Sequence, residues 1–255
     1  MTAPARWLVV AVAAIAVAAA ACTPADVSPA AVDPTPHQQA GPLRYVALGD
    51  SLATGVGEET TYVDVFARHL GRVTGQQVDT TNLGRAGWTS GQLLAALTTD
   101  DTFRDAVAQA NVVTWDIGGN DLLIAAANER ADRCAPGMCL HRAVHDFESN
   151  WEAIVAELIA LRSGPDTRML TFDLYEPFVA PAAPPVPRGG RRALQAVNRT
   201  IRATGARAGF EVGRVTRAFR EGGAELIAAD GIHPTPAGHR AIAEALADAW
   251  RRPLP

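Results

Sequence analysis

The chain has 255 residues, of which 48% are hydrophobic and 20% charged, so its composition is that of a folded globular protein and not of a disordered, collagen-like or coiled-coil chain. This length suits one sizeable domain. The formal net charge is −4, so the strong basic excess of nucleic-acid-binding proteins is missing, and we expect no nucleic-acid partner.

Residues 1–21 have the pattern of a secretory signal peptide. Arg6 supplies a positive charge, and Trp7 to Ala21 form an uncharged apolar run. The run is too short to cross a bilayer comfortably but suits the apolar region of a signal peptide. A membrane-anchoring helix is the alternative interpretation.

The run ends at Ala19-Ala20-Ala21-Cys22, which resembles the lipobox of bacterial lipoproteins. That resemblance implies that Cys22 carries lipid, anchors the chain to the outer face of the cell membrane and begins the mature protein. Lipoboxes usually have Leu where this chain has Ala19, and Ala-x-Ala is also an ordinary cleavage site, so secretion without lipid stays open. Residues 22–42 are rich in proline and lack apolar periodicity, which predicts an unfolded tether before a domain at 43–255.

The chain has three cysteines, and lipid on Cys22 would leave Cys134 and Cys139. The residues between these two favour a turn, so in an oxidising compartment we expect a disulfide that closes a short loop. A metal site with His141 and His145 is the alternative. Two thiolates are too few for a structural zinc ion, and we expect no metal.

Strand and helix patterns alternate through the predicted domain. The predicted strands are Leu43–Leu48, Val78–Leu83, Asn111–Ile117, Arg168–Leu174 and Phe210–Gly213. One predicted helix carries Tyr62 to Leu70, and another starts at Ser90 as its capping residue. The remaining predicted helices span Phe103–Ala110, Asp146–Arg162, Arg191–Thr204 and Ala237–Trp250. Such alternation predicts an α/β fold with a parallel sheet covered on both faces. In such sheets the ligand crevice lies beyond the carboxyl ends of the strands.

Gly49-Asp50-Ser51 directly follows the first predicted strand. A serine at this edge of the sheet can act as a nucleophile if a base takes its proton. By itself, however, Ser51 is more simply explained as a helix cap.

Asp230-Gly231-Ile232-His233-Pro234 precedes the last predicted helix. Asp230 can hold one imidazole nitrogen of His233 and leave the other free as a general base. The simpler interpretation of this segment alone is a surface turn.

Two further strands end in residues that suit an oxyanion site. Gly118-Gly119-Asn120-Asp121 follows the third strand, where the Asn120 amide could stabilise a developing oxyanion. Gly84 follows the second strand and could offer its backbone N–H. Each feature is unremarkable alone.

Together, the four segments resemble the signature blocks of the SGNH (GDSL) hydrolase family. The blocks are Gly49-Asp50-Ser51-Leu52, Asn82-Leu83-Gly84, Gly118-Gly119-Asn120-Asp121 and Asp230-Gly231-Ile232-His233-Pro234, and the resemblance covers roughly Leu43 to Trp250. It implies a three-layer, flavodoxin-like fold with a five-stranded parallel sheet, and an ester hydrolase without cofactor or metal. No Gly-x-Ser-x-Gly elbow surrounds Ser51, which argues against the larger α/β-hydrolase fold.

The same resemblance implies a role for each matched residue. Ser51 would be the nucleophile, His233 the general base and then acid, and Asp230 the residue that orients His233. The oxyanion donors would be the backbone N–H groups of Ser51 and Gly84 and the Asn120 side chain. Asp50, Gly119 and Asp121 would have supporting roles.

The motifs leave the substrate open. The expected specificity loops are 128–145 and 176–190, where Phe178 and Val179 would line an acyl site or pack on the domain. One hypothesis is an envelope esterase for small or medium acyl groups, and another is a polysaccharide O-deacetylase. The third is a surface lipoprotein that only binds, which the intact motifs disfavour. We expect a monomer that acts on small-molecule or polysaccharide esters.

Overall fold

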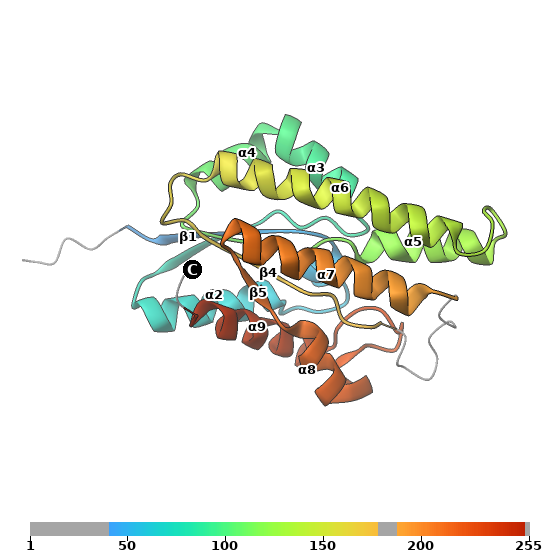
Figure 1. Ribbon diagram of the computed structural model, residues 1–255. Coiled ribbons are helices and arrows are strands. Elements are labelled where there is room, and N and C mark those ends of the chain that lie inside the picture. The colour runs from blue at the N-terminus through green and yellow to red at the C-terminus, as the bar shows by residue number, and fades with distance from the viewer. Residues whose placement is uncertain (1–40, 178–187, 253–255) are drawn as a thin grey trace, which may run out of the picture. The chain divides into compact units, whose positions relative to one another are not determined.

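Five short strands form one parallel sheet in the computed structural model, which describes residues 41–177 and 188–252 (Figure 1). The strands are β1 (Leu43–Leu48), β2 (Val78–Asn82), β3 (Val112–Trp115), β4 (Arg168–Phe172) and β5 (Glu211–Gly213). They lie in the order β2-β1-β3-β4-β5, all pairs parallel. This is the flavodoxin-like order, so the predicted fold class is confirmed.

Alternate residues of the central strands point to opposite faces of the sheet, as strand geometry requires. Val46 and Leu48 of β1 enter one core cluster with Trp115 of β3. Tyr45 and Ala47 of β1 enter the other cluster. The sheet is therefore buried on both faces, and its long apolar runs match that environment.

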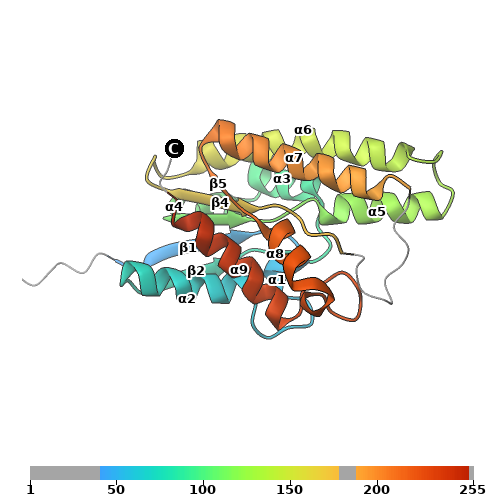
Figure 2. The same cartoon turned by 60° about the horizontal axis from the view of Figure 1, so that its bottom comes forward.

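Helices cover both faces, which gives three layers (Figures 1 and 2). The helices of the upper layer in Figure 2 are α3 (Ser90–Thr99), α4 (Asp101–Gln109), α5 (Gly119–Arg130), α6 (Met138–Leu161) and α7 (Gly190–Ala208). On the other face lie α2 (Tyr62–Thr74), α8 (Val215–Gly222) and α9 (Pro236–Trp250). The short helices are α1 (Ser51–Thr54) and the 3-10 turn Gly223–Leu226.

The structure corrects the predicted specificity loop 128–145. Helix α5 runs to Arg130 and α6 already begins at Met138, so only seven residues, 131–137, connect the two helices. Helix α5 could not be recognised from its residue pattern, because apolar side chains occur around most of its circumference and the usual amphipathic period is absent. Ser90 is also not a cap: Thr89 precedes α3 as its N-cap.

Several predictions lie outside the described residues. They are the signal peptide at 1–21, Cys22, residues 22–40 of the predicted tether, and residues 178–187 of the second predicted loop, including Phe178 and Val179. Within the ranges that the structure describes, no helix is both long and apolar enough to span a membrane.

Candidate active site

Ser51 is the first residue of α1, at the carboxyl end of β1. Asp50, rather than Ser51, caps this helix: its Oδ1 accepts the Leu52 N–H at 3.0 Å. The simpler interpretation of Ser51 as the cap is therefore wrong. Its half-buried side chain lines a pocket at this edge of the sheet. The helix is too short to stand alone, so its place depends on the cap and on the packing of buried Leu52 and Ala53.

Asp230 holds His233 through both carboxylate oxygens. Oδ1 accepts the backbone N–H groups of Ile232 and His233 at 2.9 and 3.0 Å, while Oδ2 lies 2.5 Å from His233 Nδ1. With a proton on Nδ1, Nε2 of His233 is left free to accept one. Burial alone would raise the pKa of Asp230, but its hydrogen bonds from Ile232 and His233 lower the pKa overall, so the carboxylate stays charged.

The His233 loop reaches the same pocket as Ser51, because Ile232 lines it together with Ser51. Among the described residues no hydrogen bond joins the Ser51 hydroxyl to His233. Such bonds are often long in the absence of substrate, so this geometry is compatible with the roles predicted for Ser51 and His233.

The Asn120 amide lies near the start of α1. Its Nδ2 donates to the Trp88 carbonyl at 2.9 Å and, over a longer 3.3 Å, to Asp50 Oδ2. The N–H that points to Asp50 is held only weakly, so it could donate to a substrate oxygen in the pocket instead. Asn120 belongs to the first turn of α5 and lines the pocket with Ser51.

Gly84 does not offer the free N–H that its motif implies. Its N–H donates to Asn82 Oδ1 at 3.0 Å. Glycine is needed here for another reason: a Cβ at residue 84 would lie 2.7 Å from the Cβ of Ala53, so only glycine lets α1 pack this closely on the end of β2.

Gly87 has a backbone N–H that the sequence analysis did not consider as a donor. It lies in a turn closed by the Trp88 N–H and the Arg85 carbonyl at 3.2 Å, and its φ of +82° suits glycine. Its own N–H has no hydrogen-bond partner within residues 41–177 and 188–252. The neighbouring Trp88 carbonyl holds Asn120, so the two donors lie close together. The Gly-x-Thr-Ser run at 87–90 was the available signal.

Two of the residues predicted to have supporting roles hold the helices of the site in place. Asp121 accepts the Ser90 N–H at 2.9 Å and the Ser90 hydroxyl at 2.5 Å, which ties the start of α5 to the start of α3. Burial raises the pKa of Asp121 despite these two donors. Gly119 is the first residue of α5 and lines the pocket.

The pocket beside Ser51 is mostly apolar. The space between its walls is about 810 Å³, part of it open to solvent. Asp50, Ser51 and Asn120 lie at its polar end. Its apolar wall is formed by Leu52, Leu122, Leu123, Ala126, Leu140, Leu174, Tyr175, Pro177, Leu194 and Ile232.

Tyr175 connects this wall to the histidine loop. Its hydroxyl donates to the Ile232 carbonyl at 2.5 Å, and its ring stacks on Phe219 with centroids 4.0 Å apart. Burial raises the pKa of the hydroxyl well above its usual value, so it stays protonated and remains a donor. Glu176 and Arg191 form an ion pair of 2.6 Å at the pocket.

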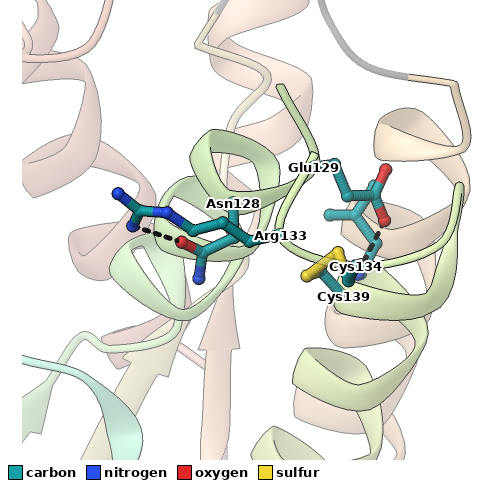
Figure 3. Close-up of a disulfide and its surroundings, with 6 residues drawn as sticks. Asn128, Glu129, Arg133, Cys134 and Cys139 are labelled. Carbon is teal, nitrogen blue, oxygen red and sulfur yellow. Dashed lines mark hydrogen bonds between the residues drawn. A yellow bond between two sulfur atoms is a disulfide. The ribbon is translucent and has the colours of Figure 1, made fainter. Parts of the chain in front are cut away.

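Figure 3 shows a disulfide near the end of α5 and the start of α6. The structure joins Cys134 and Cys139, whose Cα atoms are 6.0 Å apart, across the connection between α5 and α6. Leu140, the next residue, lines the pocket, and its N–H donates to Glu129 Oε1 at 3.1 Å. The closed loop therefore borders the pocket. The described residues contain no cluster of three or more His, Cys, Asp or Glu side chains that could hold a metal ion.

Comparisons with known proteins agree with this arrangement. Residues 47–241 match the GDSL-like lipase/acylhydrolase family. A spore germination lipase, LipC, of Bacillus licheniformis is 25% identical over 209 residues, which cover 80% of this chain and 94% of the lipase.

Solved structures share the fold. The lipase Lip_vut3 from a goat rumen metagenome superposes with a TM-score of 0.72 at 23% identity, covering 81% of this chain and 97% of that one. Axe2, an acetylxylan esterase from Geobacillus stearothermophilus, gives a TM-score of 0.62 at 18% identity, with 84% and 97% covered. With most of its domain matched, the chain belongs to the GDSL-like lipase/acylhydrolase family and is an ester hydrolase of the SGNH type.

Proposed function

We propose that the protein is a serine esterase that hydrolyses carboxylic esters of small or medium acyl groups through Ser51, His233 and Asp230. The 2.5 Å contact between His233 Nδ1 and Asp230 Oδ2, on a loop that borders the pocket of Ser51, carries this proposal. It matches the orientation that a serine nucleophile requires of its base.

The reaction follows from these positions. His233 Nε2 takes the proton of the Ser51 hydroxyl while Oγ attacks the ester carbonyl carbon. The carbonyl oxygen becomes an oxyanion, which the N–H groups of Ser51 and Gly87 and the Asn120 amide stabilise. Gly87 takes the role first given to Gly84, because the Gly84 N–H is already bound by Asn82.

The carbon–oxygen bond of the ester then breaks, and His233 gives its proton to the leaving alcohol. The acyl group stays on Ser51 Oγ. A water molecule next loses a proton to His233 and attacks the acyl carbon, which releases the carboxylic acid and restores the Ser51 hydroxyl. Asp230 stays ionised throughout and stabilises the imidazolium form of His233.

The apolar wall favours an acyl chain over a sugar. Saccharides are bound by many polar side chains or by an aromatic platform, whereas ten of the residues that line this pocket are apolar. Its polar side chains are Asp50, Ser51 and Asn120 at one end and the Glu176–Arg191 ion pair. Polysaccharide O-deacetylation therefore remains the alternative function, and the test below includes acetylated xylan as a substrate for it.

The test compares Ser51→Ala with Thr54→Ala, which removes an exposed hydroxyl from the same helix. We expect Ser51→Ala to lose about four orders of magnitude or more in kcat on p-nitrophenyl esters. Thr54→Ala should stay close to wild type. Wild-type turnover by Ser51→Ala would overturn the mechanism. Faster release of acetate from acetylated xylan than of hexanoate from its p-nitrophenyl ester would favour the deacetylase.

We also propose export with lipid on Cys22. A disulfide between Cys134 and Cys139 fits an oxidising compartment outside the cytoplasm. Intact-mass analysis of the protein from its native host tests this proposal. The expected mass is that of a chain starting at an acylated Cys22 with no free thiols, and a mature chain without acyl mass and with two free thiols would refute it.

A further inference from the structure

A second buried carboxyl group lies beneath the turn that carries Ser51. Asp116 follows β3 and is 1% exposed. Its Oδ2 accepts the Asp50 backbone N–H at 3.3 Å, and its Oδ1 accepts the Tyr62 hydroxyl at 2.5 Å. A Cβ at residue 49 would lie 2.4 Å from Asp116 Oδ1, so Gly49 is what lets this carboxyl reach its place.

The 3.3 Å contact between Asp116 Oδ2 and the Asp50 backbone N–H holds two buried carboxyl groups next to each other. Asp50 is 4% exposed, and no arginine pairs with either group among the described residues. Two buried carboxylates this close cannot both stay ionised. Burial raises the pKa of each group, and the charge of Asp50 raises that of Asp116 further.

Asp50 is the member of the pair that touches the site. Its Oδ1 caps α1 through the Leu52 N–H, and its Oδ2 lies 3.3 Å from the Asn120 amide nitrogen. The position of this carboxyl therefore fixes the start of the helix that begins with Ser51 and orients the Asn120 side chain. Asp116 touches neither Ser51 nor Asn120, so any effect it has on the reaction passes through Asp50.

We propose that Asp116 is a positioning residue for the ester hydrolysis proposed above: it shares one proton with Asp50 and thereby holds that carboxyl beneath Ser51 and Asn120 with a single negative charge on the pair. The inference rests on the proposed function. A second negative charge on the Asp50–Asp116 pair would repel the oxyanion that forms at the neighbouring donors. This electrostatic repulsion is strong because the site is buried.

The proposal predicts a loss of kcat at alkaline pH, when the shared proton leaves the pair. The groups that face the pair or its partners from the surrounding elements are Tyr45 of β1, Tyr62 of α2, Asp121 of α5, Tyr175 after β4, His233 of the catalytic loop and His239 of α9. Tyr45 and Tyr62 have pKa values raised by burial, and the pKa of His239 is lowered. These groups are present in wild type and in the variants. A difference between the proteins in the fall of kcat at alkaline pH, the alkaline limb of the pH profile, therefore reflects deprotonation of the Asp50–Asp116 pair.

The experiment measures kcat, KM and the pH profile of Asp116→Ala and Asp116→Asn on p-nitrophenyl butyrate, per active site counted with a fluorophosphonate. The control is Thr114→Val on the same strand, which removes an equally buried hydroxyl that contacts Tyr45 and not Asp50. We expect Asp116→Ala to lose about tenfold or more in kcat with KM changed less than about twofold. Asp116→Asn should restore most of kcat at neutral pH and abolish the alkaline limb. Thr114→Val should lower stability and keep kcat.

Full kcat per active site in Asp116→Ala overturns the positioning role. An alkaline limb that persists unchanged in Asp116→Asn overturns the shared proton, and this variant decides the matter if Asp116→Ala does not fold. Failure of the proposed function looks different: Ser51→Ala itself would then hydrolyse the ester. An inactive Ser51→Ala beside fully active Asp116 variants leaves the proposed function standing and refutes this inference alone.

Discussion

Single side chains at this site serve several partners at once. One oxygen of Asp230 accepts two backbone N–H groups and the other holds the His233 imidazole. Asn120 likewise divides one amide nitrogen between the Trp88 carbonyl and Asp50. Substituting such a residue changes both the geometry and the charge around it, so its effect on kcat has to be compared with its effect on KM.

At this scale we expect Asn120→Ala to lower kcat by about two to three orders of magnitude with a smaller change in KM, because one preorganised oxyanion donor is lost. Steady-state kinetics on p-nitrophenyl butyrate measure both constants. Asn128→Ala, which removes an amide at the other end of α5, is the control and should keep wild-type kinetics. A large rise in KM with kcat unchanged would make Asn120 a substrate-binding residue instead.

At the scale of elements, the pocket wall is built largely by three helices. Leu122, Leu123 and Ala126 come from α5, Leu140 from α6 and Leu194 from α7. The length of acyl chain that fits therefore depends on how closely α5 and α7 approach each other, and Ala126 is the small residue on this wall.

We expect Ala126→Leu to shorten the pocket. The added side chain should lower kcat/KM for p-nitrophenyl decanoate by about tenfold or more relative to the acetate ester, since each methylene in an apolar pocket is worth about 1–3 kcal/mol. Ala127→Leu places the same side chain on the exposed face of α5 and should leave the ratio unchanged. If both variants keep the wild-type ratio for a series of chain lengths, the acyl chain lies elsewhere.

The sequence was most informative where residue type and chemistry coincide. It predicted all five strands, because β1, β3 and β4 are short apolar runs and β2 and β5 alternate with helical segments in the same way, and it singled out Ser51, Asn120, Asp230 and His233. It missed α5, whose apolar residues occur all round the helix, and it assigned the N–H donor to Gly84, three residues before Gly87. It did not point to Asp116, because only the β1–β3 pairing places this carboxyl beneath Asp50.

At the scale of the whole molecule, one buried histidine connects two helices on the same face of the sheet. His239 of α9 is 1% exposed, and its Nδ1 accepts the Tyr62 N–H of α2 at 3.1 Å. Burial lowers the pKa of His239 from 6.5 to about 4. The folded protein therefore keeps this imidazole neutral at pH values where the unfolded chain protonates it.

This difference gives the free energy of unfolding a pH dependence with a definite sign. Above pH 6.5 both states are neutral at residue 239, while between pH 6.5 and about 4 the unfolded chain alone binds the proton, so stability falls as the pH falls. The loss amounts to at most about 3 kcal/mol. Urea unfolding of wild type and His239→Asn at pH 7, 5.5 and 4.5 should show a flatter dependence in the variant.

The control is His145→Asn, which changes an exposed histidine and should keep the wild-type slope. The raised pKa values of Asp50, Asp116 and Asp121 act in the opposite direction, since the protons that those carboxyl groups hold in the folded state are lost as the pH rises. They are present in all three proteins and cancel in the comparison. Parallel slopes for wild type and His239→Asn would show that His239 does not produce the acid sensitivity.

The two contacts of Tyr175 restrict how the specificity of this enzyme can be redesigned. Its ring forms part of the wall that an acyl chain would touch, while its hydroxyl holds the carbonyl of Ile232, the residue before His233, the proposed general base. A smaller side chain at this position would enlarge the pocket and also release the histidine loop, so substrate range and turnover would change together. Ala126, Leu140 and Leu194 line the same wall without a contact to that loop among the described residues, and they allow the pocket to be reshaped while the base stays in place.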